Sequence, residues 1–406
     1  MSTANADLLL QASRWSALDR LRALITVLVV VHHALLAWHP FAPPARGAWS
    51  FPPTLWQAFP IVDRERAPGV EWIVGINDNF FMALMFLIGG WFVVGNVQRG
   101  GARAFLTSRA LRLGLPFILA AGLLAPLAYY PSYLQNAGLP GLSAYWQAWQ
   151  RLLDWPAGPA WFLAVLFAFS VLAALALHWL RCLPAQLAVA GHWLLVAPWR
   201  LALGLVVVAL LGYLPLAQMT DPLSWSAWGP FTVQTARPLL YFGFFIVGMA
   251  LGATGPVAHA LLASEGALAR RWWGWLALAA AAYGLHAYFA TTVMTAWFSG
   301  GTPIGWQVWA MNGGYALACA FLSLACMALV ARFARHHNAA WRSLSNNAYV
   351  IYLLHYVVVV WLQYALLGTS ALPAWGKAAI ACMGGLALSW LLAAGLRRVP
   401  GVTRVV

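Results

Sequence analysis

Charged side chains are scarce in this sequence. Asp, Glu, Lys and Arg together make up only 8% of the 406 residues, and nine residues are acidic. Hydrophobic residues make up 63%, and the mean hydropathy is +0.75. A soluble globular domain cannot bury so much apolar surface, so the composition excludes that class and predicts a protein that crosses a membrane several times.

Cysteines are also few. Cys182, Cys319, Cys326 and Cys382 lack the paired spacing of a disulfide framework or a zinc site, so we expect packing residues and no metal site. The shortage of acids leaves a formal net charge of +14. In a membrane protein this charge indicates a cytoplasmic face that suits anionic lipid or an anionic soluble ligand, so we expect no nucleic-acid partner.

Long apolar segments recur along nearly the whole chain. Each is long enough to cross about 30 Å of hydrocarbon as a helix. The sequence therefore predicts an all-α polytopic transmembrane bundle of about ten spans, with a tail at 1–19, a membrane domain at 20–396 and a tail at 397–406. The expected spans are 20–40, 75–97, 113–134, 159–181, 200–217, 237–256, 272–294, 309–331, 344–366 and 374–396.

Basic residues are distributed unevenly between the two sides of this topology. With ten spans, 17 of the 23 Lys and Arg residues fall on the side of the termini and 6 on the other side. The positive-inside rule then predicts that both termini are cytoplasmic. A single Lys beside 22 Arg, with many Ala and Trp, is typical of a high-GC bacterial genome, so we expect a multi-pass protein of a bacterial inner membrane.

The first span carries two ionisable residues at matched positions. Residues 16–38 read SALDRLRALITVLVVVHHALLAW, with Arg22 eleven positions before His33. Eleven residues at 100° each return almost to the starting direction, so both side chains share one helix face about 16 Å apart. If Arg22 marks a membrane surface, His33 lies near the midplane, where an ionisable side chain indicates a functional site.

A second basic pattern lies between the second and third spans, in the segment QRGGARAFLTSRALRLGLP. Arg109 and Arg112 stand at i and i+3, so they project from one side of an incipient helix. Two guanidinium groups placed in this way can hold a phosphate. Loop arginines also commonly serve only to fix topology. The pairing with the pattern of the first span favours phosphate binding.

Several motifs in this order resemble the acyltransferase-3 family of integral membrane acyltransferases, which decorate surface and periplasmic glycans. Their matches run from residue 18 to residue 355. The family usually has a serine where this chain has Gly89. The matching segments are Leu18-Asp19-Arg20-Leu21-Arg22 with His33, Phe86-Leu87-Ile88-Gly89-Gly90-Trp91-Phe92, Ser108-Arg109-Ala110-Leu111-Arg112-Leu113 with Pro116, Pro159-Ala160-Trp161-Phe162-Leu163, Phe244-Phe245-Ile246-Val247-Gly248-Met249, and Leu344-Ser345 through Tyr349 to Tyr352-Leu353-Leu354-His355.

The resemblance implies transfer of an acetyl or succinyl group from cytoplasmic acyl-CoA to a hydroxyl of an extracytoplasmic carbohydrate or glycolipid. Acyl-CoA would be a co-substrate, and no permanently bound cofactor is expected. His33 would be catalytic, either as a general base or as a covalent carrier of the acyl group. Arg22, Arg109 and Arg112 would anchor the CoA phosphates. The long outer loop 41–72 would shape the choice of acceptor.

Four further residues are candidates for the acceptor site or for support of the catalytic residues. Asp19 would orient a neighbouring arginine, Arg22 or Arg20. Asp78 would contact acceptor hydroxyls or simply start a helix, and Trp161 would be an acceptor platform or an interfacial residue. His355 would be a second site residue or a packing partner. The remaining histidines are assigned to interfaces and loops; apart from a packing His32, they are His39, His178, His192, His259, His286, His336 and His337.

Two other classes stay open on the residues alone. In a proton-coupled transporter, His33 and Arg22 would belong to a proton or substrate pathway. A purely structural membrane subunit of a glycan-export complex is the third alternative. The absence of obvious repeat symmetry and the presence of an arginine pair outside the membrane argue against a transporter.

Overall fold

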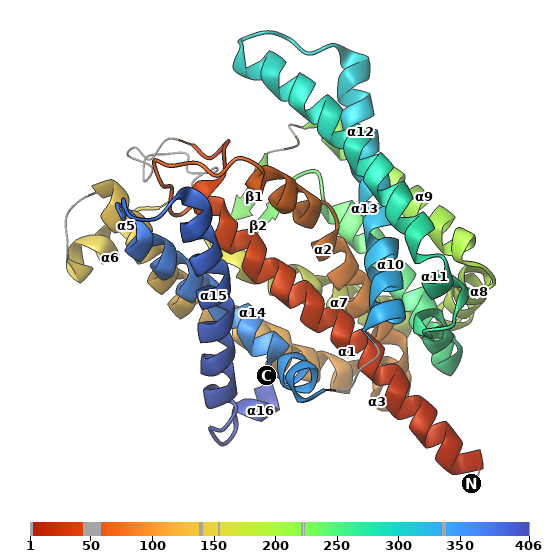
Figure 1. The fold of residues 1–406 in the computed structure, drawn as a ribbon. Coiled ribbons are helices and arrows are strands. Elements are labelled where there is room, and N and C mark those ends of the chain that lie inside the picture. The colour runs from red at the N-terminus through yellow and green to blue at the C-terminus, as the bar shows by residue number, and fades with distance from the viewer. Residues whose placement is uncertain are drawn as a thin grey trace.

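The computed structural model describes residues 3–43, 58–137, 141–152, 155–220, 222, 224–334 and 338–405. Within these ranges the chain is a helical bundle with one short β-hairpin (Figure 1). The elements are α1 (Thr3–Leu35), η1 (Leu36–Trp38), α2 (Val70–Trp91), α3 (Val93–Arg109), η2 (Ala110–Gly114), α4 (Leu115–Leu119), η3 (Ala120–Leu124), α5 (Ala125–Ala137), α6 (Leu142–Gln150), η4 (Gly158–Ala160), α7 (Trp161–Trp179), α8 (Leu183–Leu195), α9 (Pro198–Met219), β1 (Trp225–Trp228), β2 (Phe231–Gln234), α10 (Pro238–Ala253), η5 (Gly255–Leu262), α11 (Ala267–Arg270), α12 (Trp272–Phe298), α13 (Gly305–Phe333), α14 (Ala339–Leu366), α15 (Ala374–Leu396) and α16 (Val402–Val405).

The expected number of membrane spans is confirmed. In the described part of the chain, nine helices are long and apolar enough to cross a membrane. Pro238–Ala253 and Gly255–Arg270 pass the same test together but meet at an angle of 113°, and they make a tenth span if counted as one. The first helix begins at Thr3, so most of the segment expected as an N-terminal tail is helical.

The connection between the second and third spans differs from the expected loop. It is helical on both sides of Gly101, whose φ of 76° turns the chain sharply inside α3. A side chain other than glycine rarely adopts this backbone conformation. The third span then continues to α5 through two π-helical turns, η2 and η3. Arg109 ends α3 and Arg112 lies in η2, so both arginines belong to the helical start of the third span.

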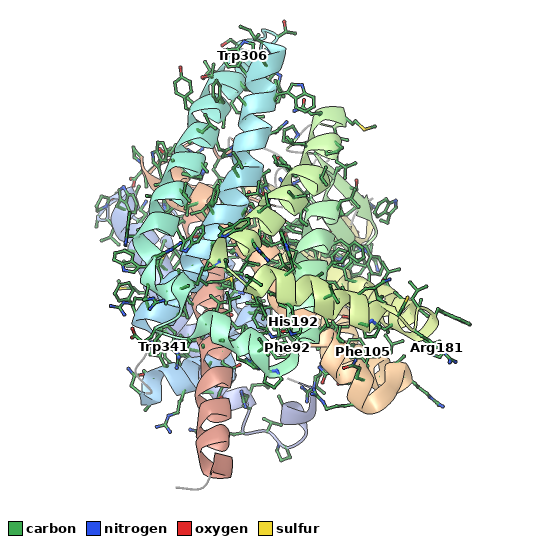
Figure 2. The ribbon with its side chains drawn as sticks, turned by 90° about the vertical axis from the view of Figure 1, so that its right-hand side faces the viewer. Phe92, Phe105, Arg181, His192, Trp306 and Trp341 are labelled. Atoms are coloured by element: carbon green, nitrogen blue, oxygen red, sulfur yellow. The ribbon has the colours of Figure 1, made fainter. Side chains whose placement is uncertain are left out.

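Peripheral helices expose their apolar side chains. Only 22% of the most apolar window is buried in Trp272–Trp297 and in Ala374–Leu396, whereas 78% is buried in Gly305–Phe333. A helix that is apolar all round yet largely exposed is expected where lipid covers it. Figure 2 shows that Trp306 lies at one tip of the α12–α13 pair, well away from Arg181 at the side of the molecule.

The core of the bundle is held by a close contact between α2 and α10. A Cβ atom built on Gly90 would lie 2.0 Å from the carbonyl oxygen of Phe245, and one on Gly248 would lie 1.9 Å from that of Leu87. These two backbones therefore touch directly, as small residues allow between membrane helices. By contrast, a Cβ on Gly89 would meet only the flexible side chain of Leu166.

The first helix α1 lies at the centre and packs against α2, α14 and α15 (Figure 1). Its last turn leaves backbone carbonyls without helical partners, as every helix end does. Gln363 of α14 is the partner of two such carbonyls. Its Nε2 donates to the carbonyl oxygens of His33, at 2.8 Å, and of Ala34, at 3.1 Å. The backbone that carries His33 is therefore fixed from a neighbouring helix.

The described part of the outer loop is tied to the bundle by a buried ion pair. Lys377 Nζ lies 3.1 Å from Asp63 Oδ2, and Trp38 Nε1 donates to the same oxygen at 3.0 Å. Burial alone would raise the pKa of the Asp63 carboxyl, but hydrogen bonds from the Glu65 backbone, Lys377 and Trp38 hold it below its usual range. Residues 44–57 of the loop 41–72 lie outside the described residues, as do Arg46, Asp154, Asp221, Arg335, His336 and His337.

Candidate active site

A cavity of about 350 Å³ contains His33 in its wall. α1 contributes His32 and His33, α2 contributes Asp78, and further lining residues come from α5, α7, α10 and α14. The hairpin β1–β2 contributes Trp225, Thr232 and Gln234. We call this space the outer cavity, because it lies on the side of the bundle that carries the loop 41–72.

A chain of hydrogen bonds defines the state of the His33 ring. His355 Nδ1 lies 2.7 Å from the carbonyl oxygen of Tyr352, and His355 Nε2 lies 3.2 Å from His33 Nδ1. His33 Nδ1 also lies 2.8 Å from the carbonyl oxygen of Val29. A carbonyl oxygen only accepts, so Nδ1 carries the proton in both rings and His355 Nε2 accepts. The lone pair of neutral His33 is therefore on Nε2.

A bidentate ion pair stands in the wall of the same cavity. Arg237 precedes α10, and its two terminal nitrogens lie 2.9 and 2.5 Å from the carboxylate oxygens of Asp78 on α2. The guanidinium also lies over the ring of Tyr315, 5.0 Å from its centroid. The side chain of Arg237 is 7% exposed and that of Asp78 is 39% exposed. The arginine is therefore buried behind the carboxylate, which faces the cavity.

Three aromatic rings form a stack beside this ion pair. Phe86 stacks on Tyr241 with centroids 4.9 Å apart, and Tyr241 stacks on Trp161 at 5.7 Å. Phe86 and Tyr241 are buried, whereas Trp161 is partly exposed and lines the outer cavity. The indole is thus held in one orientation from behind.

The second cavity, about 260 Å³, collects the three arginines selected from the sequence. Arg22 of α1, Arg109 of α3 and Arg112 of η2 all line it, together with Gly89 and apolar residues of α2 and α7. Asp19 Oδ1 lies 3.1 Å from Arg22 Nη1, and the Arg109 guanidinium lies over the Phe105 ring. Val405 of α16 also borders this space, which we call the arginine cavity.

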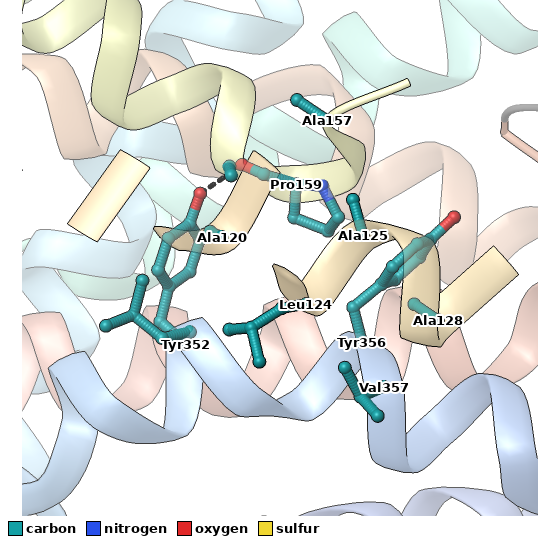
Figure 3. A pocket seen from close by; sticks show the side chains of 11 residues that line it. Ala120, Leu124, Ala125, Ala128, Ala157, Pro159, Tyr352, Tyr356 and Val357 are labelled. Atoms are coloured by element: carbon teal, nitrogen blue, oxygen red, sulfur yellow. Dashed lines mark hydrogen bonds between the residues drawn. The ribbon is translucent and has the colours of Figure 1, made fainter. Parts of the chain in front are cut away.

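Among the described lining residues, Tyr352 of α14 is the one that the outer cavity and the arginine cavity share. Its hydroxyl donates a hydrogen bond to the carbonyl oxygen of Pro159 in η4, which Figure 3 shows as a dashed line. The same residue provides the carbonyl that holds His355. Tyr352 therefore separates the histidine end of the site from its arginine end.

A comparison with protein families identifies the chain. A family model described as an acyltransferase domain matches residues 15–394, nearly the whole sequence. The chain belongs to the acyltransferase-3 family. The comparison with curated proteins and the comparison with solved structures gave no match. Membership makes this protein a membrane acyltransferase, an enzyme that moves acyl groups other than aminoacyl groups.

The acyltransferase fold places the selected residues in two groups. Arg22, Arg109 and Arg112 meet in the arginine cavity. His33, Asp78 and Trp161 meet in the outer cavity, with His355 buried behind His33. Asp19 forms a salt bridge with Arg22, one of the two neighbouring arginines that it was expected to orient. In the described ranges, no group of three or more His, Cys, Asp or Glu side chains is arranged to hold a metal ion.

Several residues of the acyltransferase site are not apparent from the sequence. Arg237 is a single charged residue in a connection between spans, Thr232 lies in a short hairpin, and Tyr352 is one aromatic among many. His39 was assigned to an interface, but it borders the outer cavity. Two signals were available: the Gly229-Pro230 pair marks the turn of the hairpin, and an arginine directly before an apolar span needs a polar partner.

Proposed function

We propose that this acyltransferase moves an acetyl or succinyl group from cytoplasmic acyl-CoA to a hydroxyl of an extracytoplasmic carbohydrate or glycolipid. One observation carries the proposal: an arginine-lined cavity and a histidine-lined cavity meet at a single residue, Tyr352. A phosphate-rich donor fits the first cavity and a hydroxyl acceptor fits the second. The uneven distribution of basic residues supports a cytoplasmic arginine cavity, cytoplasmic termini and a bacterial inner membrane.

The three arginines are suited to the CoA phosphates. Arg109 and Arg112 come from the helical start of the third span, and Arg22 is oriented by Asp19, so three positive charges line one cavity. Guanidinium groups bind phosphate oxygens bidentately, and pre-organised side chains lose little entropy on binding. The rise of α1 separates Arg22 from His33 by about 16 Å, a distance that the pantetheine arm can span.

His33 is suited to activate the acceptor. Its Nε2 lone pair takes the proton of the acceptor hydroxyl as that oxygen attacks the thioester carbonyl. The new C–O bond forms, the C–S bond breaks, and the imidazolium returns its proton to the leaving CoA thiolate. The Nδ1–H of His33 is shared between the carbonyl oxygen of Val29 and His355 Nε2, which favours the Nδ1–H tautomer and leaves Nε2 as the base.

A transfer assay tests the function. Purified protein, reconstituted in bilayers, is incubated with acyl-CoA labelled in the acyl group and with a panel of glycosides. We expect CoA release together with labelled glycoside, and both should require the acceptor. Uptake of the intact label into vesicles without CoA release would instead identify a transporter and would overturn the proposal.

Removal of the paired arginines should weaken donor binding. We expect the double variant Arg109→Ala, Arg112→Ala to lose CoA affinity, because each charge-assisted phosphate contact contributes on the order of 1.5–3 kcal/mol. Equilibrium binding of CoA measures the loss. The variant Arg181→Ala, which changes an exposed arginine outside the arginine cavity, is the control. Unchanged CoA binding by the double variant would leave these residues a role in topology only.

A further inference from the structure

One residue in the wall of the outer cavity has a polar group without a hydrogen-bond partner in the described part of the chain. Thr232 lines the cavity and is 8% exposed, and no described residue hydrogen-bonds to its hydroxyl. Buried polar groups are nearly always satisfied, so this hydroxyl favours a polar ligand in the cavity.

The carboxylate of Asp78 adds fixed acceptors to the same wall. Each of its oxygens receives one hydrogen bond from Arg237, which leaves further lone pairs on the exposed side of the group. Because the guanidinium holds the carboxylate bidentately, the direction of these lone pairs is set before a ligand binds. Hydroxyl groups, which donate and accept, match such a wall.

The Trp161 indole adds an apolar face. It ends the stack that Phe86 and Tyr241 form, so its position is fixed and no side-chain freedom is lost when a ligand packs against it. A ligand that presents a flat C–H face and a rim of hydroxyls satisfies both the indole and the polar wall. A sugar ring has this form.

The charge of the cavity wall disfavours a sugar ring that carries a carboxylate. Among the described lining residues, the cation Arg237 is already neutralised by Asp78. Burial lowers the pKa of the His39 imidazole to about 4, so this ring is neutral at pH 7. Glu71 adds a negative charge at the same wall. A carboxylate on the ligand would be buried without a partner, which is costly.

From these observations we infer that the outer cavity is a binding site for an uncharged pyranoside, which lies against Trp161 and hydrogen-bonds to Asp78 and Thr232. The inference rests on the proposed function, since it assigns the acceptor end of the same reaction. It adds a ligand class and the residues that select it.

Binding without donor tests the site independently of catalysis. Saturation-transfer NMR on the reconstituted protein compares methyl glucopyranoside with methyl glucuronide. We expect the neutral ring to bind and the uronide to bind at least roughly tenfold more weakly, because its carboxylate lacks a partner. Equal or tighter binding of the uronide would overturn the assignment of an uncharged ligand. Binding of neither sugar would overturn the site itself.

Thr232→Val is the sharpest variant, because the hydroxyl it removes has no hydrogen-bond partner among the described residues and its loss breaks no contact seen there. We expect the KM for the glycoside acceptor to rise roughly three- to tenfold, the size of one neutral hydrogen bond, with the KM for acyl-CoA unchanged. Thr235→Val is the matched control, because the hydroxyl of Thr235 contacts Ser226 outside the cavity lining. An unchanged acceptor KM in Thr232→Val would remove this residue from the site.

Trp161→Leu tests the platform, and the exposed Trp179 at the far end of the same helix provides the control Trp179→Leu. We expect roughly tenfold weaker binding of methyl glucopyranoside only in Trp161→Leu. Equal binding of methyl glucopyranoside by both variants would show that the sugar ring does not pack against Trp161. Failure of acyl transfer by the wild-type protein, with sugar binding intact, would refute the proposed reaction and leave the site standing.

Discussion

Replacing His33 with asparagine should reduce acyl transfer by roughly 10²-fold or more, while expression and acyl-CoA binding stay normal. Asparagine keeps a polar side chain of similar reach but cannot act as a base at neutral pH. The loss is at the low end of what a positioned acid–base group contributes. Single-turnover transfer from labelled acyl-CoA measures it, and CoA binding is measured on the same preparation.

The matched control is His192→Asn. His192 Nδ1 lies 2.7 Å from the carbonyl oxygen four residues earlier, the same local contact that His33 makes, but its helix α8 borders neither cavity. We expect this variant to retain transfer. Substantial transfer by His33→Asn at normal expression would reduce His33 to a packing residue and would remove the mechanism.

Loss of the Asp78 carboxylate should produce the largest change in stability. In Asp78→Ala the Arg237 guanidinium, only 7% exposed, keeps its charge but loses both hydrogen bonds. Removing one partner of such a pair costs about 3–5 kcal/mol, and the partial exposure of Asp78 places the expected loss near the lower figure. The unfolding midpoint of the purified protein, followed in one detergent, should fall accordingly.

Two comparisons separate this ion pair from an ordinary surface pair. Glu265→Ala, which affects an exposed pair with Arg332 at 3.5 Å, should cost less than about 1 kcal/mol. The double variant Asp78→Leu, Arg237→Met should regain much of the lost stability, because it leaves no buried charge. An unchanged midpoint in Asp78→Ala would show that water reaches Arg237.

The sequence predicted those features that depend on the period of one helix. The spacing of Arg22 and His33 follows from 3.6 residues per turn, and the spans follow from hydropathy, so both could be predicted without tertiary information. The Asp78–Arg237 pair joins residues 159 positions apart, and the His33–His355 contact joins residues 322 positions apart. Such pairs depend on how helices cross, which a single sequence does not specify.

Local irregularities were harder still to predict. The turn at Gly101 and the π-helical turns η2 and η3 replace the expected loop before the third span. Glycine at a positive φ is a possibility at every Gly-Gly pair, and a π-turn adds one residue to an otherwise regular helix. The first irregularity decides the direction of the chain, and the second decides which side of the helix presents Arg112.

The hydrogen bond between Tyr352 and Pro159 has a consequence for the energy balance of the cell. A charge that leaks down a membrane voltage of about 100 mV dissipates about 2.3 kcal/mol. On the proposed function, the acyl group passes Tyr352 while it is attached to the pantetheine arm, so transfer needs no continuous water-filled pore between the two cavities. The reaction would then leave the membrane voltage intact.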